Sequence, residues 1–231
     1  SGKSAVNSDA AKKAYAAQAT VVRRVSDGEG RVVHKMSQQY QLTGQIDQLP
    51  QVKAGRLIFF RTPDLPPGSH NVAMAVHDGK GKRSSVVETA VEVPGGASPV
   101  VGSLFVVARA ERIGPKDTSA ATHPLAGGGV LLYPSFGDPI SRKAQSEIAF
   151  ALPMVIDAAA PAPSATLELL QKGQSLAQLP LPLDKPDGKG RLLQVSRLPS
   201  AAIPPGEYEL RITITAGSTR ISRSTPLAVI E

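Results

Sequence analysis

The chain has 231 residues, no cysteine and a formal net charge of +7, from 26 Lys and Arg against 19 Asp and Glu. The lack of cysteine excludes disulfides, thiolate catalysis and zinc sites built on thiolates. The basic residues come in small separated groups, and with no Trp, five Phe and four Tyr there is little to stack on bases, so we expect no nucleic-acid binding.

The hydropathy of the sequence indicates whether the chain contains a membrane span or a signal peptide. The longest apolar runs, 100–108 and 148–156, fall well short of the roughly 20 residues that a spanning helix needs, so we expect no membrane span within these residues. Residues 1–20 hold no apolar core of a signal peptide. If the protein is exported, we expect its signal to lie upstream of Ser1.

Residues 1–18 are expected to form an N-terminal tail or a short helix. Ser8 and Asp9 suit a helix N-terminus, and the residues from Ala10 to Gln18 are rich in Ala, the strongest helix former. The alternative is that Tyr15 onward already belongs to the first strand.

Residues 19–94 are predicted to form a first β-sandwich. A hairpin turns at Asp27–Gly30 between two runs rich in β-branched residues, and Gly55–Arg61 is expected to be a short apolar strand. A strand follows the Pro-Pro-Gly turn at 66–68, and Ser85–Val93 closes the module. Residues 95–99 contain two glycines and Pro99 and are expected to form a linker.

Residues 100–231 predict a second β-sandwich. Its early strands lie at 103–108, 130–133 and 147–156, and Pro153 is expected to place the third at an edge or a bulge. The segment 112–142 is the long irregular stretch of this module. From residue 165 the plan of the first module recurs, with a hairpin over 167–181 and strands at 190–195 and 220–230.

One segment occurs twice. Leu65–Val76 returns as Ile203–Ile214, an offset of 138 residues, and in each copy a Pro-Pro-Gly turn precedes strict apolar alternation. Alternation of this kind is typical of a half-buried strand. We therefore predict an all-β fold of two tandem immunoglobulin-like or fibronectin type III-like antiparallel β-sandwiches.

The second copy resembles the corner of fibronectin type III domains. There a Tyr that follows a Pro-Gly turn bonds the backbone a few residues upstream, and Tyr208 stands in that place. In the first copy His70 takes the position of Tyr208, so we expect that this bond is not made in the same way.

The residues that carry chemistry form no recognisable site. His70 and His77 are seven residues apart and point to opposite faces of a strand, and His34 and His123 have no partner at a metal-site spacing. There is no Gly-x-Ser-x-Gly nucleophile motif. The Asp-Gly-x-Gly segments at 27, 78 and 187 resemble calcium loops but are expected to be turns. We predict no catalytic, cofactor-binding or metal-binding residues and no cofactor.

A family resemblance follows from the turn and strand patterns. The chain from residue 19 to 231 resembles the region downstream of the A domain in von Willebrand factor A-related proteins of Acidobacteria, through Arg23–Val33, Leu65–Gly68, Val76–Asp78, Val91–Pro94, Ser103–Leu104, Pro124–Leu125, Tyr133–Ser135 and Ile203–Tyr208. The resemblance implies an extracytoplasmic location. The A domain's metal motif, Asp-x-Ser-x-Ser, does not occur here, so none of its ligands carry over.

Three functional hypotheses follow. The first is a non-enzymatic exported bacterial protein whose modules act as spacer or protein-interaction units, with a protein partner. The second is a carbohydrate-binding module, although the Trp that usually supplies its platform is absent. The third is a hydrolase with an unfamiliar site in the 112–142 loop.

Overall fold

The computed structural model describes residues 7–9, 14–54, 58–96, 98–114, 117 and 123–231. Strands make up 61% of the chain and helices 6%, which confirms the predicted all-β class. The chain divides into two compact units, Ser1–Gly96 and Ala97–Glu231, and the boundary falls within the predicted linker. Within the described ranges, no helix is long and apolar enough to cross a bilayer.

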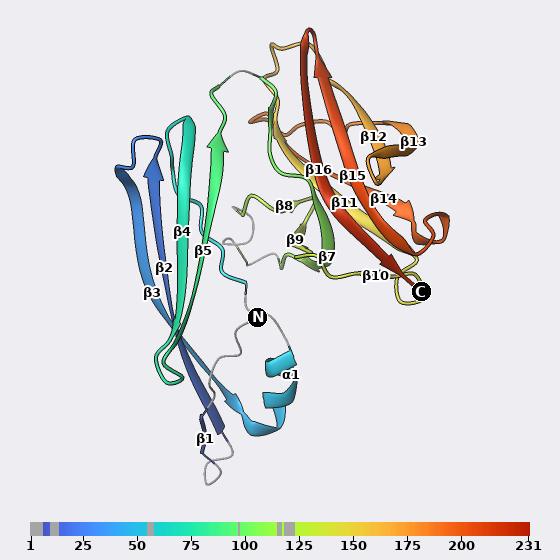
Figure 1. Ribbon diagram of the computed structural model, residues 1–231. Helices are drawn as coiled ribbons and strands as arrows, with labels where there is room; N and C mark the ends of the chain where they lie inside the picture. The colour runs from blue at the N-terminus through green and yellow to red at the C-terminus, as the bar shows by residue number, and fades with distance from the viewer. Residues whose placement is uncertain (1–6, 10–13, 55–57, 97, 115–116, 118–122) are drawn as a thin grey trace. The chain divides into compact units, whose positions relative to one another are not determined.

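The described strands of the first unit form one antiparallel sheet, shown in Figure 1. Four long strands lie in the order β3-β2-β4-β5, and short β1 pairs with the start of β2. Their bounds are β1 (Asn7–Asp9), β2 (Ala14–Asp27), β3 (Val32–Gln45), β4 (Gly68–Asp78) and β5 (Arg83–Val93).

One face of this sheet is apolar, and we call it the inner face. On β2 every second side chain is buried, and the register places the matching side chains of the other strands on the same side. The face comprises Tyr15, Ala17, Ala19, Val21, Arg23 and Val25 on β2, His34, Met36, Gln38, Tyr40 and Leu42 on β3, His70, Val72, Met74, Val76 and Asp78 on β4, and Ser85, Val87, Thr89, Val91 and Val93 on β5. The outer face carries mainly polar residues, as expected where one side of an antiparallel sheet meets water.

The inner face is covered in part by the segment that joins β3 to β4. A 3-10 turn, η1 (Ile46–Gln48), and a short helix, α1 (Leu49–Ala54), lead into residues 58–67, which have no regular structure. The ring of Phe59 lies 4.5 Å from that of Tyr40. The carbonyl oxygens of Arg61 and Pro66 bond to side chains of the sheet. We call residues 58–67 the covering segment.

Two expectations for the first unit are corrected. Ala14–Gln18 belongs to β2 and not to a helix, while residues 10–13 lie outside the described part. Strand pairing with β3 overrides the helix propensity of Ala here. The expected strand Gly55–Arg61 is not formed over 58–61, and residues 55–57 lie outside the described part.

The second unit is a β-sandwich of two sheets. One sheet has the order β10-β16-β15-β12-β13, and the other has the order β14-β11-β7-β9-β8 with β6 paired to β11. Their bounds are β6 (Val100–Val101), β7 (Phe105–Arg112), β8 (Ala126–Gly127), β9 (Val130–Pro134), β10 (Ile140–Ser141), β11 (Glu147–Val155), β12 (Ser164–Gln171), β13 (Gln174–Leu181), β14 (Arg191–Pro199), β15 (Gly206–Ala216) and β16 (Thr219–Ile230), with a 3-10 turn η2 (Ser200–Ala202) before β15.

The same four-stranded sheet is built twice. The order β3-β2-β4-β5 of the first unit recurs as β13-β12-β15-β16 in the second. The registers match as well: Val25 faces Val72 in the first sheet, and Leu169 faces Leu210, which lies 138 residues after Val72, in the second. The units differ in what covers this sheet. In the second unit another sheet packs over it, whereas the described part of the first unit has one sheet alone, so the predicted first sandwich is a single layer there.

Candidate functional site

The matched registers allow the two inner faces to be compared position by position. Leu210, Ile212 and Ile214 of β15 are 0%, 0% and 1% exposed in the sandwich. Their counterparts on β4, which are Val72, Met74 and Val76, are only half-buried. The first sheet therefore keeps part of its apolar face accessible.

The contrast is largest on β5. Val91 is 40% exposed, whereas Leu227, which faces Tyr208 as Val91 faces His70, is 2% exposed. Val87 lies on the same face and is 63% exposed. We call this part of the inner face, formed by Val72, Met74 and Val76 of β4 and Val87, Thr89 and Val91 of β5, the open face.

Strand β5 is also an edge strand in the described structure. Its pairing is with β4 alone, over all eleven residues from Arg83 to Val93. An edge strand presents unpaired N–H and C=O groups, and proteins usually protect such edges with Pro, a bulge or short length. β5 has no Pro, no register shift and regular pairing throughout, so its edge is a template for another strand.

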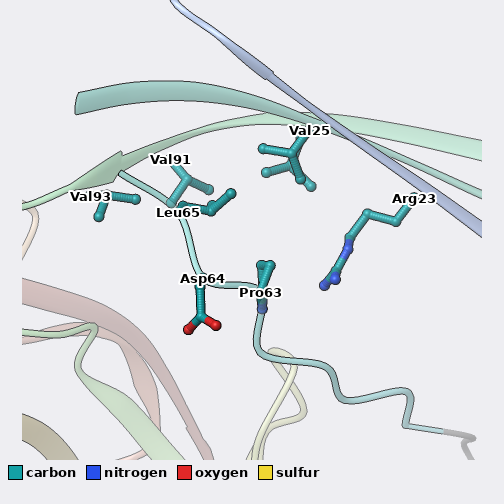
Figure 2. Close-up of a pocket in the computed structure, with 8 residues that line it drawn as sticks. Arg23, Val25, Pro63, Asp64, Leu65, Val91 and Val93 are labelled. Atoms are coloured by element: carbon teal, nitrogen blue, oxygen red, sulfur yellow. The ribbon is translucent and has the colours of Figure 1, made fainter. Parts of the chain in front are cut away.

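A cavity of about 460 Å³ opens beside the open face, between the sheet and the covering segment (Figure 2). Its walls are mainly apolar and are formed by Arg23 and Val25 of β2, Val72 of β4, Val91 and Val93 of β5, and Pro63, Asp64 and Leu65 of the covering segment. A volume of this size is within the range of small-ligand pockets, so it can hold one or two side chains of a bound peptide.

Arg23 is the cation among the residues that line this cavity. It faces Met74, as Leu167 of the sandwich core faces Ile212, so a cation occupies a position that is apolar in the second unit. The residue is 8% exposed. Its Nη1 donates to the Arg61 carbonyl oxygen at 3.2 Å, but its Nε is buried and has no hydrogen-bond partner.

An unpartnered buried N–H of a charged group is costly, by roughly 1–3 kcal/mol or more. Figure 2 shows the guanidinium directed into the cavity, while the carboxylate of Asp64 points away from it. Within the described residues Arg23 has no ion pair. The arrangement therefore places a buried cation, without an acidic partner among the described residues, in the wall of the cavity.

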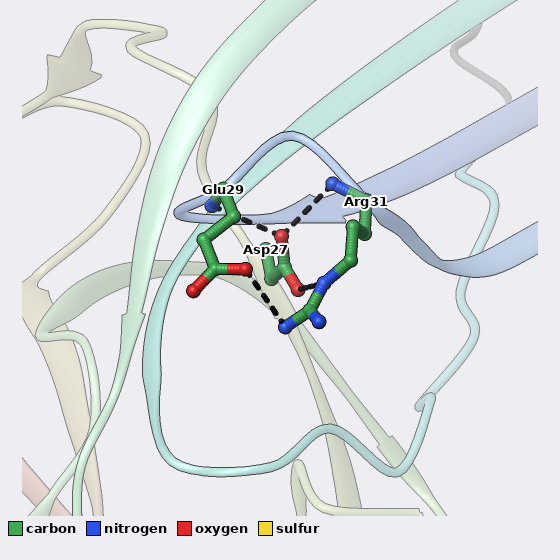
Figure 3. Close-up of polar contacts among 3 residues, drawn as sticks. All are labelled: Asp27, Glu29 and Arg31. Atoms are coloured by element: carbon green, nitrogen blue, oxygen red, sulfur yellow. Dashed lines mark hydrogen bonds and ion pairs between the residues drawn. The ribbon is translucent and has the colours of Figure 1, made fainter.

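The Asp-Gly-x-Gly segments are turns, as predicted. In Figure 3 Asp27 Oδ1 accepts from the backbone N–H groups of Glu29 and Arg31 at 3.0 and 2.9 Å, and Oδ2 accepts from Arg31 Nε at 3.0 Å. Asp187 makes the same three bonds with Lys189 and Arg191. In the described part of the chain, no group of three or more His, Asp and Glu could hold a metal ion.

These hydrogen bonds lower the pKa values of the two carboxylates, Asp27 and Asp187. Partial burial raises the pKa of Asp27, but the hydrogen bonds from Arg31 and Glu29 outweigh it, and the pKa lies below the usual value. For Asp187 the backbone hydrogen bond from Arg191 is the largest cause, and its pKa is lowered too. Both carboxylates are held charged by the turns that they close.

The four histidines do not form a cluster among the described residues, and the expectation about the corner bond of His70 is wrong. His70 Nε2 lies 2.8 Å from the Pro66 carbonyl oxygen, and Tyr208 Oη lies 2.9 Å from that of Pro204, so both copies make the corner bond to the residue four positions back. Imidazole N–H and phenol O–H reach the same acceptor because both are donors at the end of a ring. The bond that we expected His70 to lose is kept.

The other three histidines lie on separate elements. His77 is on the outer face of β4, opposite to His70 as predicted, with Nδ1 2.9 Å from Ser84 Oγ. His34 is on β3, and its buried Nδ1 has no hydrogen-bond partner. His123 Nδ1 accepts from the Leu125 N–H at 3.1 Å, and burial lowers the pKa of this imidazole.

The alternative hypothesis of a hydrolase places an unfamiliar site in the 112–142 region. Residues 115–116 and 118–122 lie outside the described part. Within this region Tyr133 of β9 donates from Oη to Oε2 of Glu111 on β7 at 2.7 Å, and this bond raises the pKa of Tyr133. The Arg109 guanidinium lies 4.2 Å from the centre of the Tyr133 ring. Arg109 and Glu111 are exposed, Tyr133 is half-buried, and the three side chains contact one another.

Sequence reasoning did not identify the Arg23 cavity. The signal was present, because Arg23 falls on the apolar side of the alternation that runs through Tyr15, Ala19 and Val25. A cation in such a series indicates either a buried ion pair or a binding site.

A scan against protein-family models found no matching family, and a search of curated proteins found no match.

Proposed function

We propose that this chain is a non-enzymatic, exported bacterial protein-interaction region. In this proposal the first unit binds a protein partner through the open face and the edge of β5, and the second unit acts as a spacer. The observation that carries it is the difference between two sheets of equal order, one sealed by a second sheet and one open. Exposed apolar faces of this kind mark interaction sites.

The proposed location outside the cytoplasm depends on the family resemblance of residues 19–231. Fractionation of the native bacterium, with an antibody against this chain, tests it. Recovery of the protein in the cell envelope or the medium is expected, and recovery with cytoplasmic enzymes alone would contradict it.

Two other functions have weaker support. Sugar-binding sandwiches stack sugars on open aromatic faces, and the ring of Tyr133 already carries the Arg109 guanidinium. A hydrolase needs a nucleophile or a water activated by a neighbouring base. At Glu111 and Tyr133 the two polar side chains bond to each other, and Glu111 also pairs with Arg109.

The test uses two adjacent valines. Val86 and Val87 have nearly equal exposure, 64% and 63%, but lie on opposite faces of β5. A phage library of random nine-residue peptides is panned against the full chain, and selected peptides are measured with V87E and V86E. We expect a loss of affinity of roughly tenfold or more for V87E, because a carboxylate replaces an apolar contact, and little change for V86E. Failure to select any peptide, or equal loss in both variants, would contradict the proposed function.

A further inference from the structure

The second unit indicates what a complete cover for this sheet consists of. There β11 packs on the inner face of the repeated sheet through Ile148, Phe150, Leu152 and Met154, all at most 3% exposed. These residues alternate along an extended strand. An occupant of the open face in the first unit would match it best with the same pattern, which is an extended segment with an apolar residue at every second position.

Arg23 adds a second requirement. An apolar occupant alone would seal the cavity and leave the Arg23 Nε–H buried without an acceptor, as it is in the free protein. A carboxylate at the guanidinium would instead compensate the buried charge. The sequence charge agrees: residues 1–96 hold 13 Lys and Arg against 8 Asp and Glu, so +5 of the net +7 belongs to this unit.

We propose that the cavity between Arg23 and residues Pro63–Leu65 receives an acidic side chain from an extended, otherwise apolar segment of a partner protein. The apolar residues of that segment lie on Val87 and Val91, and its carboxylate pairs with the Arg23 guanidinium. Asp64 stands at the cavity rim with its carboxylate turned away. The inference rests on the proposed function and names the chemistry of the partner.

Panning the nine-residue library against the full wild-type chain and against R23M tests it. Met is close to Arg in length, and the counterpart position holds Leu167, so R23M is expected to fold, which circular dichroism checks. Peptides selected on the wild type should carry Asp or Glu at one fixed position within an alternating apolar pattern. Peptides selected on R23M should keep the alternation and lose the acid.

A double-mutant cycle then isolates the contact. For one selected peptide, exchange of its Glu for Gln should weaken binding to the wild type by roughly tenfold and leave binding to R23M unchanged. R23K keeps the charge without the planar fork and should recover only part of the affinity.

Several outcomes would overturn the inference. If peptides selected on both proteins lack a fixed acid, or the exchange weakens binding equally on both, Arg23 does not hold a carboxylate, although loss of binding in V87E would still support the proposed function. If sedimentation equilibrium shows a dimer that V87E dissociates and V86E does not, the occupant is a second copy of this chain. If no peptide is selected at all, the proposed function itself fails.

Discussion

A hydrogen bond to the residue four positions back fixes the start of β4 and of β15. The donors are His70 and Tyr208, both buried, at 2.8 and 2.9 Å from their carbonyl acceptors. Since a carbonyl only accepts, His70 carries its proton on Nε2. The imidazole replaces the phenol at the corner without loss of the bond.

We expect the substitutions H70F and Y208F to lower the free energy of unfolding by about 1 kcal/mol or more each, because each removes one hydrogen bond. Phe keeps the ring of Tyr208, whereas at His70 it replaces the imidazole with a larger ring. H70Y should be more stable than H70F, since a hydroxyl can again reach the Pro66 carbonyl oxygen. Urea unfolding followed by circular dichroism measures both. Wild-type stability of H70F would show that the bond contributes nothing.

The carboxylates of Asp27 and Asp187 in the two turns predict how the stability of the fold depends on pH. The folded-state pKa values of Asp27 and Asp187 lie below the usual value, so the charged forms stabilise the fold. This contribution is complete above the unfolded pKa, about 3.9, and is lost as the pH falls through the folded pKa.

The substitution D187N keeps an acceptor for the backbone N–H groups but removes the charge that pairs with Arg191. The urea midpoint of D187N should therefore lie below that of the wild type at pH 6, and the gap should narrow at pH 3. The size of the effect is limited by exposure to solvent. If the difference between the two urea midpoints widens towards pH 3, the charged form of Asp187 does not stabilise the fold.

At the scale of elements, the two Asp turns provide a matched pair of glycines. Gly30 and Gly190 both have positive φ, at 84° and 75°. A Cβ at Gly30 would meet nothing within 4 Å, whereas a Cβ at Gly190 would lie 2.4 Å from the Ile156 carbonyl oxygen. Both sites carry backbone strain on substitution, but only the second adds a clash with backbone.

G30A should cost about 1–2 kcal/mol of stability, the price of a left-handed conformation for a residue with Cβ. G190A should cost more, by about 1–3 kcal/mol, because β14 must move away from the end of β11. Urea unfolding of the two variants checks the order. Equal losses would mean that the Ile156 contact is relieved without strain.

The strands were largely predictable, and their partners were not. Periodicity identified the repeated strand and the hairpin turn at Asp27. The Ala-rich start of β2 was interpreted as a possible helix because local propensity favours it, and only pairing with β3 reveals a strand. Pro153 was expected at an edge or a bulge, but β11 is a central strand, and Pro153 lies between the residues that pair with β7 and those that pair with β6.

The candidate site was less predictable from the sequence than the strands, because it depends on tertiary structure. Arg23 is visible in the sequence as a cation on an apolar face, but the cavity arises from the path of residues 58–67. Residues 58–60 of that segment have the apolar composition of a strand, whereas Pro63, Pro66 and Pro67 cannot donate to a ladder. Whether it pairs depends on a neighbour: in the second unit β14 pairs with β11 along nine residues, and the described part of the first unit contains no such partner strand.

At the scale of the whole molecule, the same sheet order occurs in two settings. In the second unit a second sheet seals it, so that β15 and β16 contribute to a core. In the first unit the covering segment protects β2 and the start of β4 but leaves β5 exposed. The division suits a sealed spacer and an open binding unit.

The most direct test of this difference uses the absence of cysteine, because an introduced thiol is then the only one in the chain. V91C on β5 and V229C on β16 are near-isosteric changes on the corresponding inner faces, at positions that are 40% and 2% exposed. In native buffer the thiol at 91 should react with a water-soluble maleimide faster than the thiol at 229 by roughly a factor of ten or more, and the two rates should become equal in urea. Equal, slow reaction of both thiols in native buffer would show that the first sheet is sealed and would contradict the account.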